Sequence, residues 1–107
     1  MLSISIEALQ ARMSAGEAIQ LIDVRETFEH DQFNIGGQLI PLADILQHIS
    51  LIATDKPVVL YCEKGIRSQI AIQRLLQKSN FTNLYNLSGG LARWRKMQDG
   101  GNSATEI

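Results

Sequence analysis

A single cysteine, Cys62, begins a stretch of residues whose types suit nucleophile and anion chemistry. Gly65 follows within the same stretch, Ser68 closes it, and Lys64 and Arg67 supply positive charge. A glycine permits a positive φ at which successive amide N–H groups point inward toward an anion. The thiolate is the reactive form of cysteine, and neighbouring cations and amides favour it over the thiol. We therefore interpret Cys62 as a reactive residue rather than as an inert buried thiol.

The cysteine stretch stands between an expected strand and an expected helix. Residues 57–61 (PVVLY) form an apolar run that is typical of a strand buried on both faces. Ile72 and Leu75 then follow at helical spacing, and we expect their helix to begin near Arg67 or Ser68. The positive end of that helix stabilises an anion at its first turn.

Apolar runs and helical patterns alternate along the rest of the chain. We expect further strands at residues 19–24, 38–40 and 83–87, and helices over residues 6–13, after a capping Ser5, and 42–49. This alternation predicts an α/β fold with a mostly parallel sheet covered by helices on both faces. Ligands bind beyond the carboxyl ends of the strands in such sheets, where Cys62 and the segment Asp23-Val24-Arg25 fall.

The whole chain has the length and composition of one globular domain. Of its 107 residues, 45% are hydrophobic and 20% charged. We expect a domain over residues 1–97 and a flexible tail over residues 98–107, which are polar and rich in glycine. The net charge of −1 predicts no nucleic-acid partner. No apolar run has the length of a membrane span and the first residues do not resemble a signal peptide, so we expect no membrane association.

The cysteine count also bounds the chemistry. One cysteine excludes an internal disulfide and a multi-cysteine metal site, and we expect neither a metal nor a cofactor. An unpaired thiol fits a reducing compartment, which predicts a cytoplasmic protein.

Residues 61–68 (YCEKGIRS) resemble the active-site loop of rhodanese-like domains. That loop has a cysteine, two variable residues, a glycine, one variable residue, an arginine, and then serine or threonine. Three further segments agree with the family in order and spacing, namely residues 22–26 (IDVRE), 40–42 (IPL) and 87–94 (LSGGLARW). The resemblance covers nearly the whole domain. It implies a central parallel sheet of about five strands with helices on both faces.

The resemblance also implies a sulfurtransferase of the thiosulfate sulfurtransferase type. Cys62 would take sulfur from a small donor, thiosulfate or a persulfide, and a thiophilic acceptor, cyanide or a thiol, would remove it from the resulting persulfide. A sulfur-accepting protein is a further candidate partner. Asp23 and Arg25 are implied to brace the loop, and their alternative is a surface ion pair of little consequence. The implied binding loop consists of Glu63, Lys64, Gly65, Ile66, Arg67 and Ser68, with Arg67 positioning an anionic donor.

Other polar and aromatic residues are interpreted as structural. We expect no catalytic role for His30 or His48, because sulfur transfer by a thiolate needs no general base. The family's usual histidine lies in a Gly-His-Ile-Pro-Gly-Ala-like segment, and residues 32–37 (QFNIGG) depart from that pattern. The pair Gly89-Gly90 is typical of a tight turn with close packing, and Trp94 of an anchor at the end of a domain.

Three other functions compete with turnover of a sulfur donor. A phosphatase or arsenate reductase has five residues between its cysteine and arginine, whereas residues 63–66 supply four and make a smaller cradle. A regulatory binding module generally loses the cysteine, which this chain keeps. A non-turnover persulfide carrier uses the same residues, so the choice between enzyme and carrier stays open. Glu63 should repel the thiosulfate dianion, and we expect a persulfide to be the better donor.

Overall fold

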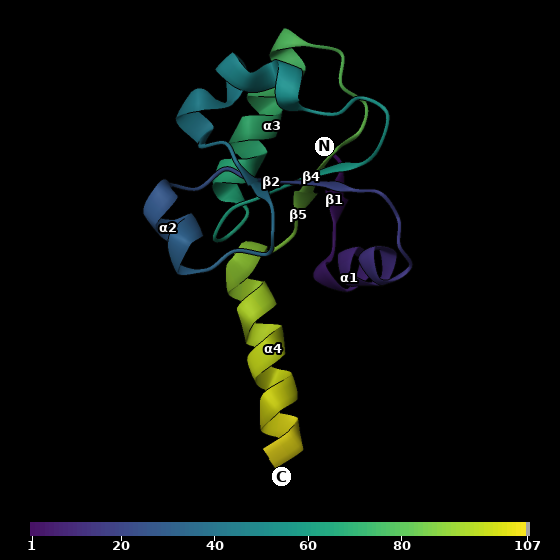
Figure 1. Ribbon diagram of the computed structural model, residues 1–107, viewed down its shortest axis with the longest axis vertical. Coiled ribbons are helices and arrows are strands. Elements are labelled where there is room, and N and C mark those ends of the chain that lie inside the picture. The colour runs from purple at the N-terminus through teal and green to yellow at the C-terminus, as the bar shows by residue number, and fades with distance from the viewer. Residues whose placement is uncertain (107) are drawn as a thin grey trace.

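Five parallel strands form one sheet in the order β1-β5-β4-β2-β3 (Figure 1). The computed structural model describes the backbone of residues 1–106 and the side chains of residues 1–99. The strands are β1 (Ser3–Ile4), β2 (Gln20–Asp23), β3 (Gln38–Leu39), β4 (Val58–Tyr61) and β5 (Leu84–Leu87). The helices are α1 (Ile6–Ser14), α2 (Thr27–Gln32), the 3-10 helix η1 (Leu42–Leu51), α3 (Ile66–Lys78) and α4 (Gly90–Glu106). The predicted α/β fold with a parallel sheet is confirmed.

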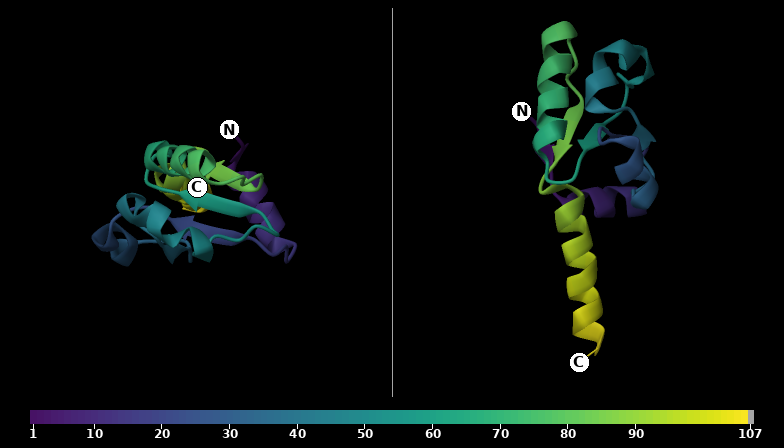
Figure 2. Two further views of the ribbon diagram at one scale, coloured as in Figure 1. Left: turned by 90° about the horizontal axis from the view of Figure 1, so that it is seen from above. Right: turned by 90° about the vertical axis from the view of Figure 1, so that its left-hand side faces the viewer.

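Strand β4 lies in the middle of the sheet and contributes side chains to two apolar cores. Val58 and Leu60 pack with residues of η1 and α3 on one face, whereas Val59 and Tyr61 pack with α1 and the first turns of α4 on the other. All four side chains are fully buried. Burial on both faces explains why the run is apolar throughout instead of alternating with polar residues. Figure 2 shows helices on the two sides of the sheet.

The three helices expected from the sequence are present, and two of them differ from the expectation in helix type or in starting residue. Helix α1 begins after Ser5, whose Oγ accepts the amide N–H of Ala8 at 3.0 Å as the predicted cap. The helix expected over residues 42–49 is the 3-10 helix η1, and it is interrupted at His48, where φ is −120°. Helix α3 begins at Ile66, slightly earlier than expected, because the chain turns into the helix directly at a glycine.

Two elements, β1 and α2, have no apolar periodicity from which the sequence could predict them. Strand β1 has two residues and is defined by its pairing with β5, where Ser3 lies opposite Asn86. Helix α2 buries none of its residues, so no apolar periodicity marks it. A capping box that joins Glu26 and Glu29 stabilises its first turn. This short helix nevertheless lies beside the cysteine loop.

Helix α4 continues past residue 97, where the domain was expected to end. It reaches Glu106 and extends away from the sheet (Figure 1). The flexibility expected for residues 98–107 stays a prediction, and residue 107 lies outside the described part of the chain. Among the helices within residues 1–106, none is long and apolar enough to cross a membrane.

Candidate active site

Cys62 directly follows β4 at the carboxyl edge of the sheet, and 1% of it is exposed. The backbone amides of Gly65 and Ser68 donate hydrogen bonds to its Sγ at 3.1 and 3.4 Å. Gly65 precedes the first residue of α3 and has the expected positive φ, +91°. The sulfur therefore lies at the positive end of α3 and accepts hydrogen bonds that a negative charge on it would strengthen.

Ser68 joins the first turn of α3 to strand β5. Its hydroxyl donates to Oδ1 of Asn86, and its Oγ lies 3.4 Å from Sγ of Cys62. Both polar residues are buried. Sequence reasoning did not select Asn86. The available signal was a polar residue inside the apolar strand LYNL, where a buried amide needs a hydrogen-bond partner.

The first turn of α4 packs against the backbone of the cysteine loop. The amide of Leu91 donates to the carbonyl oxygen of Cys62 at 3.0 Å. The amide of Ala92 donates to the carbonyl oxygen of Glu63 at 2.9 Å. Gly90 permits this approach, because a Cβ at its position would lie 2.5 Å from the carbonyl oxygen of Glu63. The tight, closely packed turn that was expected at the two glycines is present.

Asp23 and Arg25 form a buried ion pair, so the alternative of a surface pair is wrong. Nε and Nη2 of Arg25 donate to Oδ1 and Oδ2 of Asp23, at 3.0 and 2.9 Å. His30 of α2 places its Nδ1 2.9 Å from the same carboxylate. Arg25 also donates to the carbonyl oxygen of Phe33. This hydrogen bond connects residues 32–37, where the sequence departs from the family pattern, to the end of β2. Nη1 of Arg25 lies 3.6 Å from Oε1 of Glu63, and this is where the pair meets the cysteine loop.

The carboxylate of Glu63 is held between two arginines. Arg95 of α4 donates to its Oε2, and Arg25 lies on the other side. The guanidinium of Arg95 also stacks over the ring of Phe33, 5.4 Å from the ring centroid. The negative charge that was expected to repel an anionic donor is therefore partly compensated. Sequence reasoning missed Arg95, because nothing in its spacing relates it to the loop.

Arg67 forms a two-pronged ion pair with Glu29 of α2. Its Nη1 and Nη2 donate to Oε1 and Oε2 of Glu29, at 2.7 and 2.9 Å. The hydrogen bonds from Arg67 lower the pKa of Glu29 to about 2, and the same contact raises the pKa of Arg67. The sequence led us to expect an Arg67 that faces a donor anion. Its two terminal nitrogens instead bind a carboxylate that sequence reasoning did not select.

Two openings meet at the cysteine loop. A cavity of about 350 Å³ is lined by Cys62, Glu63, Lys64, Ile66 and Arg67. A cleft of about 440 Å³ shares Glu63 with this cavity. Its other lining residues come from the segment between β2 and β3, which includes α2, and from α4: Arg25, Phe28, Glu29, Gln32, Phe33 and Arg95. The predicted loop residues thus surround one opening, with Gly65 and Ser68 binding the sulfur through their amides.

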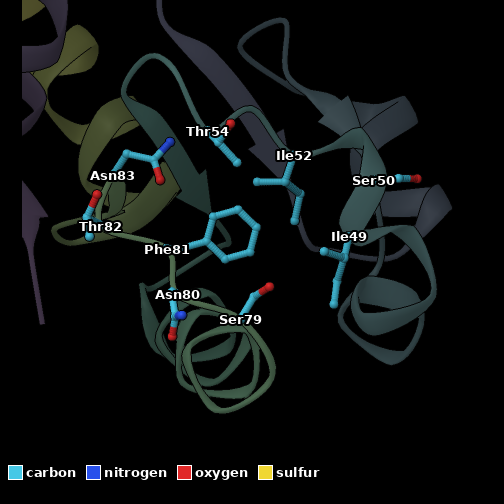
Figure 3. Close-up of a pocket in the computed structure, with 9 residues that line it drawn as sticks. All are labelled: Ile49, Ser50, Ile52, Thr54, Ser79, Asn80, Phe81, Thr82 and Asn83. Atoms are coloured by element: carbon cyan, nitrogen blue, oxygen red, sulfur yellow. The ribbon is translucent and has the colours of Figure 1, made fainter.

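A further cavity of about 430 Å³ lies at the opposite, amino-terminal end of β4 and β5. Figure 3 shows the ring of Phe81 pointing into it, near Ile49 and Ile52. Its lining holds hydroxyl and amide groups, and none of its residues is a thiol, an acid or a base. Among the side chains that the structure describes, no cluster of His, Cys, Asp or Glu could hold a metal ion.

Fold and site together define an α/β protein with a thiol at the amino end of a helix. A model of the rhodanese-like domain family matches residues 5–97. The chain therefore belongs to the rhodanese-like domain family, as its four motifs predicted.

Individual relatives agree with this assignment. The chain is 47% identical over 76 residues to the uncharacterized protein YqhL of Bacillus subtilis, covering 70% of this chain and 60% of that protein. It is 34% identical over 94 residues to a sulfurtransferase of Allochromatium vinosum, covering 87% of each. A solved structure of a rhodanese-related protein from Thermoplasma volcanium matches with a TM-score of 0.79 and 26% identity, covering 91% of this chain and 93% of that one. Several relatives are longer, and the chain spans 24% to 60% of their length.

Proposed function

We propose that this protein is a rhodanese-type sulfurtransferase that carries sulfane sulfur as a persulfide on Cys62. It takes sulfur from a small donor, thiosulfate or an organic persulfide, and passes it to a thiophilic acceptor, cyanide or a thiol. The observation that carries the proposal is the pair of hydrogen bonds from the amides of Gly65 and Ser68 to Sγ. Family membership and the likeness to a sulfurtransferase of Allochromatium vinosum support it.

The first step is a displacement at sulfur. The Cys62 thiolate, whose proton has passed to water, attacks the outer sulfur of the donor. A new S–S bond forms while the donor's own S–S bond breaks, and sulfite leaves thiosulfate with the bonding electron pair. From an organic persulfide the leaving group is a thiolate. The amides of Gly65 and Ser68 hold the attacking sulfur in place.

The second step returns Cys62 to its starting state. The acceptor attacks the outer sulfur of the persulfide, and Cys62 leaves with the electron pair as a thiolate, producing thiocyanate from cyanide or a new persulfide from a thiol. The negative charge that returns to Sγ is stabilised by the two amides and the end of α3. Since only 1% of Cys62 is exposed, the outer sulfur is easier for an acceptor to reach than Sγ itself.

Intact-mass measurement after incubation with thiosulfate or an organic persulfide tests the proposal. We expect one added sulfur atom on the wild-type protein and none on Cys62→Ser. The serine variant should retain the circular dichroism spectrum of the wild type, because the substitution exchanges one small side chain for another. No added sulfur on the wild type with either donor, or thiocyanate formation by Cys62→Ser, would contradict the proposed mechanism.

Steady-state assays separate the alternatives. Continuous thiocyanate formation from a sulfur donor and cyanide is expected of an enzyme, whereas loading of Cys62 without turnover would identify a persulfide carrier. Hydrolysis of an aryl phosphate would point instead to a phosphatase. The spacing of four residues between Cys62 and Arg67 argues against that outcome.

A further inference from the structure

Arg67 and Lys64 both line the cavity that contains Cys62, and Arg67 is the better suited of these two loop cations to recognise an oxyanion. A guanidinium binds carboxylates, sulfonates and phosphates through two parallel N–H groups. Both terminal nitrogens of Arg67 already bind Glu29, at 2.7 and 2.9 Å. Glu29 therefore engages both of the terminal nitrogens through which Arg67 would bind the sulfonate group of an anionic donor.

Glu29 is held firmly in that position. Its Oε1 accepts a second hydrogen bond, from the amide of Glu26 at 3.1 Å, as part of the capping box of α2. Its side chain is 18% exposed, against 35% for that of Arg67. With a pKa of about 2, Glu29 stays ionised at neutral pH, so protonation does not release Arg67. A competing anion at Arg67 must therefore displace an ionised carboxylate.

The arginines of the neighbouring cleft do not replace Arg67. Arg25 is committed to the buried carboxylate of Asp23, and Arg95 binds Glu63. Lys64 makes no ion pair with any side chain that the structure describes, but it is exposed to solvent, where a lone charge attracts an anion weakly. A dianionic donor thus meets arginines that carboxylates already neutralise.

We propose that Glu29 is a specificity-determining residue of the sulfur-transfer site: by occupying Arg67 it selects organic persulfides over donors whose leaving group is an oxyanion, such as thiosulfate. The inference rests on the proposed function and names its preferred donor class. The expected preference for persulfides is thereby attributed to the carboxylate of Glu29 instead of that of Glu63. Glu63, which the sequence suggested for this role, is compensated by Arg95 and Arg25, whereas Glu29 blocks the donor-binding cation directly.

The test compares Glu29→Gln with the wild type and with Glu17→Gln. Glutamine retains the capping-box hydrogen bond to the amide of Glu26 but removes the charge that binds Arg67. Glu17 follows α1 and pairs with Arg12 of that helix at 2.6 Å, so Glu17→Gln makes the same change in net charge and breaks an exposed ion pair away from the loop. Thermal unfolding of all three proteins monitors their folding.

Single-turnover loading of Cys62 is followed by intact mass with two donors, thiosulfate and 2-hydroxyethyl persulfide, whose organic group is uncharged. We expect Glu29→Gln to load from thiosulfate about tenfold faster at subsaturating donor, the effect of about one charge-assisted hydrogen bond. The half-saturating concentration of thiosulfate should fall correspondingly. Loading from 2-hydroxyethyl persulfide should change by less than about twofold, and Glu17→Gln should match the wild type with both donors.

Three results would overturn the inference while leaving the proposed function intact. They are unchanged thiosulfate loading in Glu29→Gln when the persulfide still loads, an equal acceleration with both donors, and an equal acceleration in Glu17→Gln. The first denies that Glu29 competes with the donor, the second indicates wider access to Cys62, and the third a general effect of net charge. Failure of every protein to load from either donor would instead contradict the proposed function itself.

Discussion

The hydroxyl of Ser68 donates its single proton to Oδ1 of Asn86, although its oxygen lies 3.4 Å from Sγ of Cys62. The proton cannot serve both partners at once. The sulfur is therefore supported by backbone amides, and the Ser68 side chain fixes the first turn of α3 to β5. This arrangement separates the structural role of the side chain from the chemical role of the amide.

Replacing Ser68 by alanine should lower the free energy of unfolding and leave the rate of sulfur loading nearly unchanged. The amide of residue 68 remains at Sγ, whereas Oδ1 of Asn86 loses its buried partner, which costs about 1–3 kcal/mol of unfolding free energy. Urea denaturation measures that loss, and intact mass measures loading, which should stay within about threefold of the wild type. Ser88→Ala, at an exposed serine, is the matched control. Abolished loading at unchanged stability would show that the hydroxyl acts directly on the sulfur.

Gly90→Ala should disturb the cysteine loop through its backbone. The new Cβ would lie 2.5 and 2.6 Å from the carbonyl oxygens of Glu63 and Cys62, at a φ of +61°. Gly16→Ala is the matched control, because its φ is +80° but nothing lies within 4 Å of the added Cβ. We expect Gly90→Ala to lose about 2 kcal/mol more unfolding free energy than Gly16→Ala, and to load sulfur more slowly. Equal losses in the two variants would assign the whole effect to backbone strain.

The placement of Cys62 between a strand and a helix could be predicted because the signals for both elements and for the turn between them are contiguous in the sequence. The apolar run of residues 57–61 marks β4, which is buried on both faces. Gly65 supplies the positive φ, and the spacing of Ile72 and Leu75 marks α3. Each of these signals acts over a few residues, and the turn between strand and helix follows from them.

The partners of the loop side chains could not be predicted, because they come from distant parts of the chain. Arg67 lies 38 residues from Glu29, and Arg95 lies 32 residues from Glu63. An ion pair over such a separation leaves no periodic trace, and α2 lacks the buried apolar residues that would have placed it next to the loop. The electrostatics of the site were therefore interpreted from local charges alone. This is why Glu63 was expected to be the repulsive carboxylate.

Arg95→Ala should make thiosulfate a poorer donor. Without Arg95, the carboxylate of Glu63 loses one of its two cations and stands at the opening with more of its charge uncompensated. We expect loading of Cys62 from thiosulfate to fall about two- to fivefold, in line with the energy of a half-exposed ion pair, and loading from 2-hydroxyethyl persulfide to change less. Intact-mass kinetics with both donors provide the measurement.

Two further variants test the cause of that effect. Adding Glu63→Gln to Arg95→Ala removes the uncompensated charge and should restore thiosulfate loading. Lys96→Ala removes an exposed cation from the neighbouring position of α4 and should leave loading unchanged. A double variant that stays as slow as Arg95→Ala would indicate that Arg95 acts on the donor itself rather than through Glu63.

The ion pair between Glu29 and Arg67 should make stability depend on pH in acid. The pKa of Glu29 is lowered from 4.5 to about 2 in the folded protein, chiefly by its hydrogen bonds to Arg67, so between these values the unfolded chain binds more protons than the folded one. The stabilisation is complete above pH 4.5 and is lost as the pH falls toward 2.

The variant Glu29→Gln tests this pH dependence, because glutamine does not titrate. The wild type should therefore be the more stable protein near neutrality, with a difference in unfolding free energy that stays constant down to about pH 5 and then shrinks. Urea denaturation at a series of pH values, followed by the fluorescence of Trp94, measures this difference. If the difference in unfolding free energy between the two proteins stays the same from about pH 6 to about pH 3, Glu29 stabilises the fold through packing and helix capping rather than through its charge.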